Sequence, residues 1–104
     1  MILTLEEMKT HLRLSLDPDS EIDPQLEDLE AAAVDYASQY LGRPLPWLDD
    51  DGLPVVVPPS VRAALLLIIG DLYEHREGQI VGETIVDNPA VERLLHFYRV
   101  GLGV

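Results

Sequence analysis

The sequence predicts a mainly α-helical fold, a small bundle of about four helices around one buried helix at about residues 59–77. Residues 61–73 are apolar except at Arg62 and Asp71, and a helix that is apolar on every side is normally buried on every side. Three other segments combine a helix start signal with apolar residues spaced three and four apart. A length of 104 residues without cysteine fits one domain with a single core and no disulfide.

The central helix has clear start and stop signals. Proline is tolerated at the first helical position, so we expect the helix to begin at about Pro59, with Ser60 capping the amides of its first turn. Gly78 follows a polar last turn and readily takes the left-handed conformation that ends a helix. The run is shorter than a membrane span needs and carries charges near both ends, which favours a core helix.

The first helix is predicted from Leu5 to about Leu14. Thr4 and Glu7 have the spacing of a capping box, in which each side chain accepts a hydrogen bond from the other residue's amide. Leu5, Met8 and Leu12 follow at helical spacing and form one apolar stripe. We expect this stripe to pack on the rest of the domain.

An acidic linker is predicted at residues 17–24. Its alternating acids resemble a calcium-binding loop, but Ile22 occupies the position that needs glycine. Asp28 is also too short to replace the bidentate glutamate of such loops. We therefore expect a solvated linker with no metal.

The second helix is predicted to follow this linker, capped by Asp23 with Pro24 at its first position. Its apolar residues keep helical spacing for about five turns, and Gly42 is the expected C-cap. Tyr36 and Tyr40 are interpreted as packing residues rather than as a binding site.

Residues 43–57 form an irregular crossing, because Pro44, Pro46 and Pro54 exclude helix through most of it. We expect a turn at Asp51-Gly52 and an extended segment at residues 55–57. Trp47 is expected to anchor this loop to the core, and the alternative is that it contacts a partner.

The chain after the central helix contains a β-prone segment and a last helix. Residues 79–86 fit a short β-hairpin or an extended arm. Asn88 is expected to cap a helix that starts at Pro89 and ends near Val100, with Val91, Leu94, Leu95 and Tyr98 on its inner face. Residues 1–100 are thus expected to form one helical domain, and residues 101–104 a flexible tail.

The formal charge of −12 disfavours binding to nucleic acid or to an anionic membrane, since both repel an acidic surface. The N-terminus lacks the basic region and long apolar run of a secretory signal. The chain is therefore expected to stay in the cytoplasm where it is made.

The sequence contains no recognisable active site, so we do not expect an enzyme or a cofactor. Asp71 and His75 are four apart, as in some metal-binding pairs, but no second pair completes a site. No serine lies in a nucleophile motif, and no glycines form a phosphate-binding loop.

The order of the elements resembles the small head-tail connector, or adaptor, family of long-tailed bacteriophages and prophages. Four sequence features carry the resemblance in order. These are a Thr-Leu-Glu-Glu helix start at residues 4–7, an acidic linker, a helix closing Tyr-Leu-Gly-Arg-Pro-Leu at residues 40–45, and a central helix closing Tyr-Glu-His-Arg-Glu at residues 73–77. A short last helix with Val-Glu-Arg-Leu-Leu at residues 91–95 completes the set.

The resemblance implies a virion subunit that joins a ring of about twelve copies beneath the portal, at the head-tail junction, after synthesis in the bacterial cytoplasm. The ring would extend the DNA channel without specific DNA binding, and a stopper or tail protein would dock on it. By position, the contacts with partners are expected at the following residues: Arg43, Trp47, Asp49, Asp50, Asp51, Ile80, Val81, Ile85, Val86, Arg99 and Leu102.

Other functions remain as alternatives. An acidic helical protein can mimic DNA and inhibit a host enzyme, although the acids here cluster in loops and first turns rather than in rows. A metal hydrolase using Asp71 and His75 lacks further ligands. The stopper that lies below the adaptor is a third alternative, but it is more often β-rich.

Overall fold

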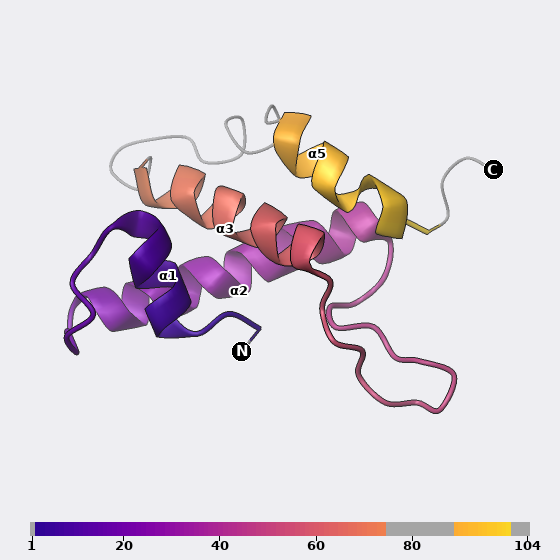
Figure 1. The fold of residues 1–104 in the computed structure, drawn as a ribbon, viewed down its shortest axis with the longest axis horizontal. Helices are drawn as coiled ribbons and strands as arrows, with labels where there is room; N and C mark the ends of the chain where they lie inside the picture. Colours follow the sequence, from indigo (N-terminus) through magenta and orange to yellow (C-terminus); the bar gives the residue numbers. More distant parts are fainter. Residues whose placement is uncertain (1, 75–88, 101–104) are drawn as a thin grey trace.

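The computed structural model describes residues 2–74 and 89–100 of the chain (Figure 1). These residues form α1 (Leu5–Leu12), α2 (Ile22–Leu41), α3 (Pro59–Glu74), α5 (Pro89–Leu95) and a short 3-10 helix, η1 (His96–Tyr98). Only one isolated β-bridge occurs among the described residues, so the mainly helical fold class is confirmed. The segment expected at 79–86, the central helix beyond Glu74 and the tail at 101–104 lie outside the described residues.

The helix α3 lies at the centre of the bundle, as the sequence predicted. It packs against α1, α2 and α5. Figure 1 shows α3 running alongside the longest helix, α2, with α1 near one end of α2 and α5 near the other. The helix begins at Pro59 as expected, whereas Ser60 lies inside its first turn rather than at the capping position before it.

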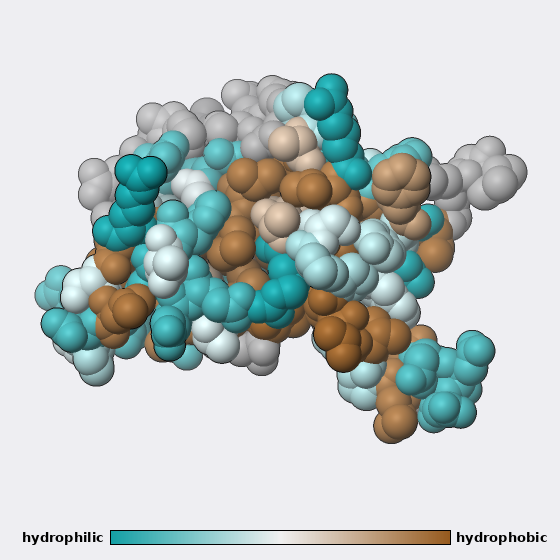
Figure 2. All heavy atoms as spheres, viewed as in Figure 1, coloured by the Kyte–Doolittle hydropathy of each residue, from teal (hydrophilic) through white to brown (hydrophobic). Residues whose placement is uncertain are grey.

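The core is built on one side of α3. Val61, Leu65, Ile68 and Leu72 recur at helical spacing and are buried among apolar residues of the other helices. Leu66 and Leu67 point the other way and are only partly buried, and Figure 2 shows hydrophobic atoms at the surface along α3. The buried central helix is therefore confirmed, and the other helices cover one side of α3 completely and the other side in part.

The capping box of α1 is confirmed. The amide of Glu7 donates to the Thr4 hydroxyl at 3.1 Å, and the amide of Thr4 donates to the Glu7 carboxylate at 3.2 Å. The helix ends at Leu12, earlier than the expected Leu14, because Arg13 takes a left-handed conformation with φ of 61°.

The start of α2 differs from the prediction. The carboxylate of Asp19 accepts hydrogen bonds from the amides of Glu21 at 2.8 Å and Ile22 at 3.0 Å, and so caps the helix from outside. Asp23 lies inside the first turn, where its carboxylate pairs with the ammonium group of Lys9 at 2.7 Å. The predicted cap at Asp23 is therefore wrong, whereas the predicted C-cap at Gly42 is confirmed by its φ of 73°.

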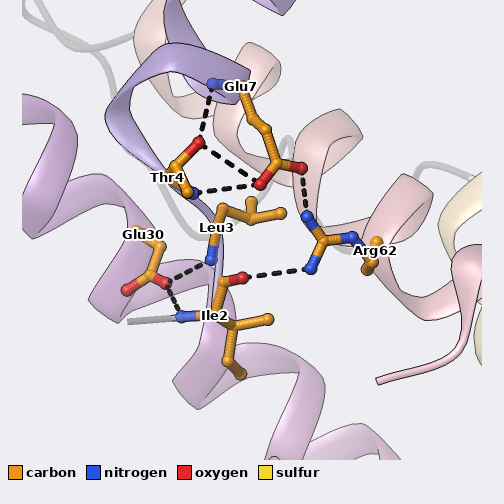
Figure 3. Close-up of polar contacts among 6 residues, drawn as sticks. All are labelled: Ile2, Leu3, Thr4, Glu7, Glu30 and Arg62. Atoms are coloured by element: carbon orange, nitrogen blue, oxygen red, sulfur yellow. Dashed lines mark hydrogen bonds and ion pairs between the residues drawn. The ribbon is translucent and has the colours of Figure 1, made fainter. Parts of the chain in front are cut away.

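The N-terminal segment is fixed between α2 and α3 (Figure 3). The buried carboxylate of Glu30 accepts hydrogen bonds from the amides of Ile2 at 2.6 Å and Leu3 at 3.1 Å. The guanidinium of Arg62 donates to the carbonyl of Ile2 at 3.1 Å and also pairs with the carboxylate of Glu7. These contacts place the buried Leu3 side chain in the core.

The last helix, α5, begins at Pro89 as predicted but ends at Leu95, before the expected Val100. Its inner residues Val91 and Leu95 are buried. The chain then tightens into η1 and becomes extended at Arg99. None of the helices in the described ranges is long and apolar enough to cross a membrane.

Candidate partner-binding surface

Residues 47–56 form a narrow projection that we call the finger (Figure 1). The amide of Val55 donates to the carbonyl of Trp47 at 3.0 Å, and the amide of Asp49 donates to the carbonyl of Leu53 at 2.8 Å. These bonds hold the two sides of the finger together around the antiparallel bridge between Leu48 and Pro54. The irregular crossing predicted from the prolines is therefore folded back on itself.

The end of the finger is ordered by Asp49. Its carboxylate accepts hydrogen bonds from the amides of Asp51 at 2.9 Å and Leu53 at 3.0 Å. The amide of Gly52 donates to the carbonyl of Asp49 at 3.0 Å, and Gly52 has a φ of 78°. The turn predicted at Asp51-Gly52 is confirmed, and the side chains of Asp50 and Asp51 remain exposed at the end of the finger.

The base of the finger is anchored on η1. The guanidinium of Arg43 lies 3.7 Å above the Trp47 ring and donates a hydrogen bond to the carbonyl of Tyr98 at 2.6 Å. The ring centroids of Trp47 and Tyr98 are 5.9 Å apart. The expectation that Trp47 anchors the loop to the core is confirmed, and Arg43 is the residue that stacks on it.

The C-terminal end of the described chain is tied to the end of α2. The amide of Val100 donates to the carbonyl of Leu41 at 2.9 Å, and the guanidinium of Arg99 lies 4.6 Å above the Tyr40 ring. A Cβ atom on Gly42 would lie 2.9 Å from the carbonyl oxygen of Val100. The end of α2, the base of the finger and η1 thus form one continuous structure.

Large apolar side chains are exposed on the finger and on η1. Val56 is 93% exposed and Phe97 is 88% exposed, and Leu48 and Leu53 are also mostly open to solvent. Figure 2 shows hydrophobic atoms along the finger and hydrophilic atoms at its end. Side chains of this size cost free energy in water, and their grouping on a projecting element is typical of a surface that binds another protein.

A second surface, which we call the C-terminal hollow, lies beside the exposed Phe97. It is lined by Tyr40, Glu92, Arg93, His96 and Phe97. Arg99 borders it through its stacking on Tyr40, and the rings of His96 and Phe97 meet edge to face at 5.7 Å. The hollow therefore combines aromatic walls with Arg93, His96 and the neighbouring Arg99, and one carboxylate, that of Glu92, also lines it.

The acidic linker is held by a buried lysine. The ammonium group of Lys9, which is only 3% exposed, donates to the carbonyl of Asp17 at 2.9 Å and pairs with the carboxylate of Asp23. The hydrogen bond from Lys9 lowers the pKa of Asp23 below its ordinary value. A side-chain cation thus lies among the acids where the calcium-loop comparison would place a metal.

Two further carboxyl groups have lowered pKa values, both outside the finger and the hollow. The hydrogen bond from Arg62 lowers the pKa of Glu7, and the amides of Ile22 and Glu21 lower the pKa of Asp19. These groups cap helices and join elements. Within the described ranges, no group of three or more histidines and acids is arranged to hold a metal ion.

The structure brings together some of the residues expected to contact partners. Arg43, Trp47 and Arg99 lie near the junction of the finger with η1, and Asp49, Asp50 and Asp51 lie at the end of the finger. The remaining expected residues lie outside the described part of the chain: Ile80, Val81, Ile85, Val86 and Leu102.

The sequence reasoning missed the exposed apolar residues. Leu48 and Leu53 flank the acidic run closely, and that proximity was an available signal for a finger with an acidic end. The buried residues of α5, Val91 and Leu95, are four apart, whereas Phe97 comes two residues after Leu95. Helical spacing therefore places Phe97 away from the buried side, which also indicated exposure.

Comparison with known proteins identifies the family to which this sequence is similar. The sequence model of the family described as phage gp6-like head-tail connector protein matches residues 2–99. The chain is 27% identical over 81 residues to the head completion protein gp6 of Enterobacteria phage HK97, covering 76% of this chain and 74% of that protein.

The fold is also similar to a solved structure. The crystal structure of bacteriophage HK97 gp6 aligns with a TM-score of 0.69 at 24% sequence identity, covering 94% of this chain and 93% of the other. The likeness extends over nearly the whole of both chains, so it concerns the complete fold rather than one motif.

Proposed function

The chain belongs to the family of phage gp6-like head-tail connector proteins, and we propose that it acts as a ring-forming subunit at the head-tail junction of the virion. It is a structural phage protein, and the family match over residues 2–99 is the observation that carries this function. The related HK97 protein is described as a head completion protein. By that relationship, this chain would be added once the head is otherwise assembled.

Ring formation is supported by the exposed surfaces of the subunit. A closed ring requires each copy to present two different surfaces that fit each other, because a head-to-tail contact repeats around the symmetry axis. The finger and the C-terminal hollow are two different exposed surfaces, and they are our candidates for this contact. About twelve copies would form the ring, as the family resemblance implies.

The proposed partners are the portal above the ring and a stopper or tail protein below it. The residues that would reach them are the acidic end of the finger, together with segment 79–86, Arg99 and Leu102. Arg43 and Trp47 would act by holding the finger in position, since both are engaged at its base.

The charge of the subunit suits a DNA channel. A wall rich in carboxylates offers the phosphates of DNA no counter-charge, so DNA can slide along it without binding. The alternative of an inhibitor that mimics DNA has no support from the comparisons, which identify a connector family.

Native mass spectrometry of the purified protein, combined with addition of the protein to DNA-filled heads that lack tails, tests this proposal. We expect either a closed oligomer in solution or stable attachment to the heads, followed by tail joining. A protein that remains monomeric and does not attach to the heads would contradict the proposal. Tight one-to-one capture of a DNA-binding enzyme would instead support the inhibitor alternative.

A further inference from the structure

The finger and the C-terminal hollow are complementary to each other. Resting on the ring-forming function proposed above, we propose that the finger of one subunit docks into the C-terminal hollow of the next copy in the ring. The apolar sides of the finger would meet Tyr40 and Phe97, and its acidic end would meet Arg93, His96 and Arg99.

The apolar part of the match comes from the largest exposed side chains. Leu48, Leu53 and Val56 lie along the finger, and Phe97 lies at the hollow. Each of these residues is open to solvent in the single subunit, so contact between the two surfaces removes both from water together. This burial would supply most of the affinity.

The electrostatic part of the match is notable because bases are scarce in this chain. There are only 7 lysines and arginines against 19 acids, and Lys9 and Arg62 are already in ion pairs within the subunit. Arg93 lines the hollow and Arg99 borders it, together with His96, whereas Glu92 is the one acid in the lining, so the arginines outnumber the carboxylate. An acidic finger from another copy would therefore find one of the few places on this surface that offers counter-charge.

The geometry favours docking to a neighbour over docking within one subunit. The finger projects away from the helices in Figure 1, and its base is fixed by the contacts among Arg43, Trp47 and Tyr98. The hydrogen bonds between its two sides also hold it in one shape before binding, which lowers the entropy lost on association. A contact between two different surfaces repeats from copy to copy and can close a ring.

Cysteine cross-linking tests this contact directly, because the chain has no cysteine of its own. The two variants are Leu53→Cys on the finger and Phe97→Cys at the hollow, both at exposed positions. A short bis-maleimide should join the two single variants into a mixed dimer. The double variant should give a ladder of higher species that ends at the size of the closed ring.

Leu16→Cys provides the matched control. Leu16 is similarly exposed but lies in the linker between α1 and α2, away from the finger and the hollow. When the Leu16→Cys and Phe97→Cys variants are mixed and cross-linked, they should give no mixed dimer above the background of random collision. Equal yields from the two pairs would overturn the proposal.

The same variants are cross-linked on tail-less heads, so that failure of the contact is distinguished from failure of the proposed function. Subunits that join heads, or form rings, without linking Leu53→Cys to Phe97→Cys would overturn this contact and leave the connector function intact. Subunits that neither associate nor join heads would overturn both proposals.

Charge reversal gives an independent test with opposite expectations. Asp50→Lys makes the subunit less negative, so a simple loss of general repulsion would strengthen assembly. Our proposal instead requires Asp50→Lys to weaken assembly by about tenfold, because it places like charge against Arg93. Arg93→Glu should weaken assembly similarly, and the two changes combined should restore much of the loss. Stronger assembly by Asp50→Lys alone would overturn the proposal.

Discussion

At the scale of single residues, the buried carboxylate of Glu30 has the clearest structural role. It is only 6% exposed and accepts hydrogen bonds from two backbone amides of the N-terminal segment. A buried carboxylate is tolerated when donors surround it, and here the donors also bring Leu3 into the core. One side chain thus holds the start of the chain on α2.

Replacing Glu30 by glutamine should destabilise the protein. Both amides donate to the same carboxylate oxygen, where glutamine can place its amide oxygen. This neutral oxygen is a weaker acceptor than a carboxylate, so the free energy of unfolding should fall by about 1–2 kcal/mol. Urea denaturation measures this change. Glu27→Gln on the exposed side of the same helix is the control, and it should change stability by less than about 0.5 kcal/mol. An equal loss for both variants would contradict the role of Glu30.

The lowered pKa values of Glu7, Asp19 and Asp23 make stability depend on pH in the acid range. In the unfolded chain these carboxyl groups take up protons at their ordinary pKa, whereas in the folded protein they do so only at lower pH. Their contribution is therefore complete above about pH 5 and is lost as pH falls through the folded pKa values. Denaturation midpoints should therefore fall as pH is lowered below about pH 4.

Lys9→Met should reduce part of this acid sensitivity, because the pKa of Asp23 then returns toward its ordinary value. The carboxyl titration of Asp23, followed by NMR, gives the shift directly. A Lys9→Met variant with an unchanged Asp23 titration would show that the ion pair does not set that pKa. Arg93→Met, at an exposed position on α5, is the control and should leave the titration unchanged.

At the scale of elements, Gly42 joins three parts of the structure. It ends α2, precedes the crossing and lies against the carbonyl of Val100. Its φ of 73° favours glycine, and its missing side chain lets the backbone at Val100 approach the end of the helix.

Gly42→Ala should lower the free energy of unfolding by about 2 kcal/mol or more, because it combines left-handed strain with overlap at Val100. Gly52→Ala separates the two effects. Gly52 has a similar φ of 78°, but nothing lies within 4 Å of the position that a Cβ atom would take. Gly52→Ala should therefore lower the free energy of unfolding by only about 1 kcal/mol. Thermal and urea denaturation compare them, and equal losses would show that the contact with Val100 adds nothing.

The finger is held together by hydrogen bonds although it is neither a helix nor a regular pair of strands. At the turn, the Asp49 carboxylate accepts hydrogen bonds from backbone amides in place of the regular bonds of a sheet. At the base, the guanidinium of Arg43 stacks on the Trp47 ring. The hydrogen bonds hold the backbone of the finger, and the apolar side chains of Leu48, Leu53 and Val56 remain exposed on it.

At the scale of the whole molecule, the charge of −12 acts against assembly. Each subunit brings the same excess of carboxylates to the ring, and this repulsion is long-ranged at low salt. Contacts between a few opposite charges act only at short range. We therefore expect general repulsion to decide the salt dependence, even where the finger meets a basic hollow.

Raising the salt concentration from about 0.05 M to 0.5 M should shift the free protein toward larger oligomers, because the screening length falls well below the size of the subunit. Sedimentation velocity at several protein concentrations measures the shift. Docking on the portal should reduce this dependence, since it supplies further contacts. Stronger self-association at low salt would contradict this account of the charge.

Much of the fold was predictable because its signals are local. The capping box at Thr4, the proline at the start of α3 and the glycine at the end of α2 each act within one turn of helix. The order of such signals, with length and acidity, was also sufficient to indicate the connector family. The anchoring role of Trp47 followed from its size within a proline-rich loop.

Other features depended on contacts between residues far apart in the sequence. Asp23 was a plausible cap, but the buried Lys9 pairs with it and leaves Asp19 to cap α2. The partial burial of Leu66 and Leu67 depended on how the other helices cover α3, which periodicity alone does not give. The Arg43 guanidinium could not be placed on Tyr98, 55 residues away, from local pattern.

The sequence by itself determined the helical class, the family, the starts of α1, α3 and α5 and the end of α2, because backbone preferences and apolar spacing depend on a few neighbouring residues. The tertiary structure decided which acids are paired, which apolar residues remain exposed, and that the finger and the C-terminal hollow both adjoin η1. The physical reason is that burial and charge pairing depend on tertiary contacts, which form only when segments distant in the chain pack together.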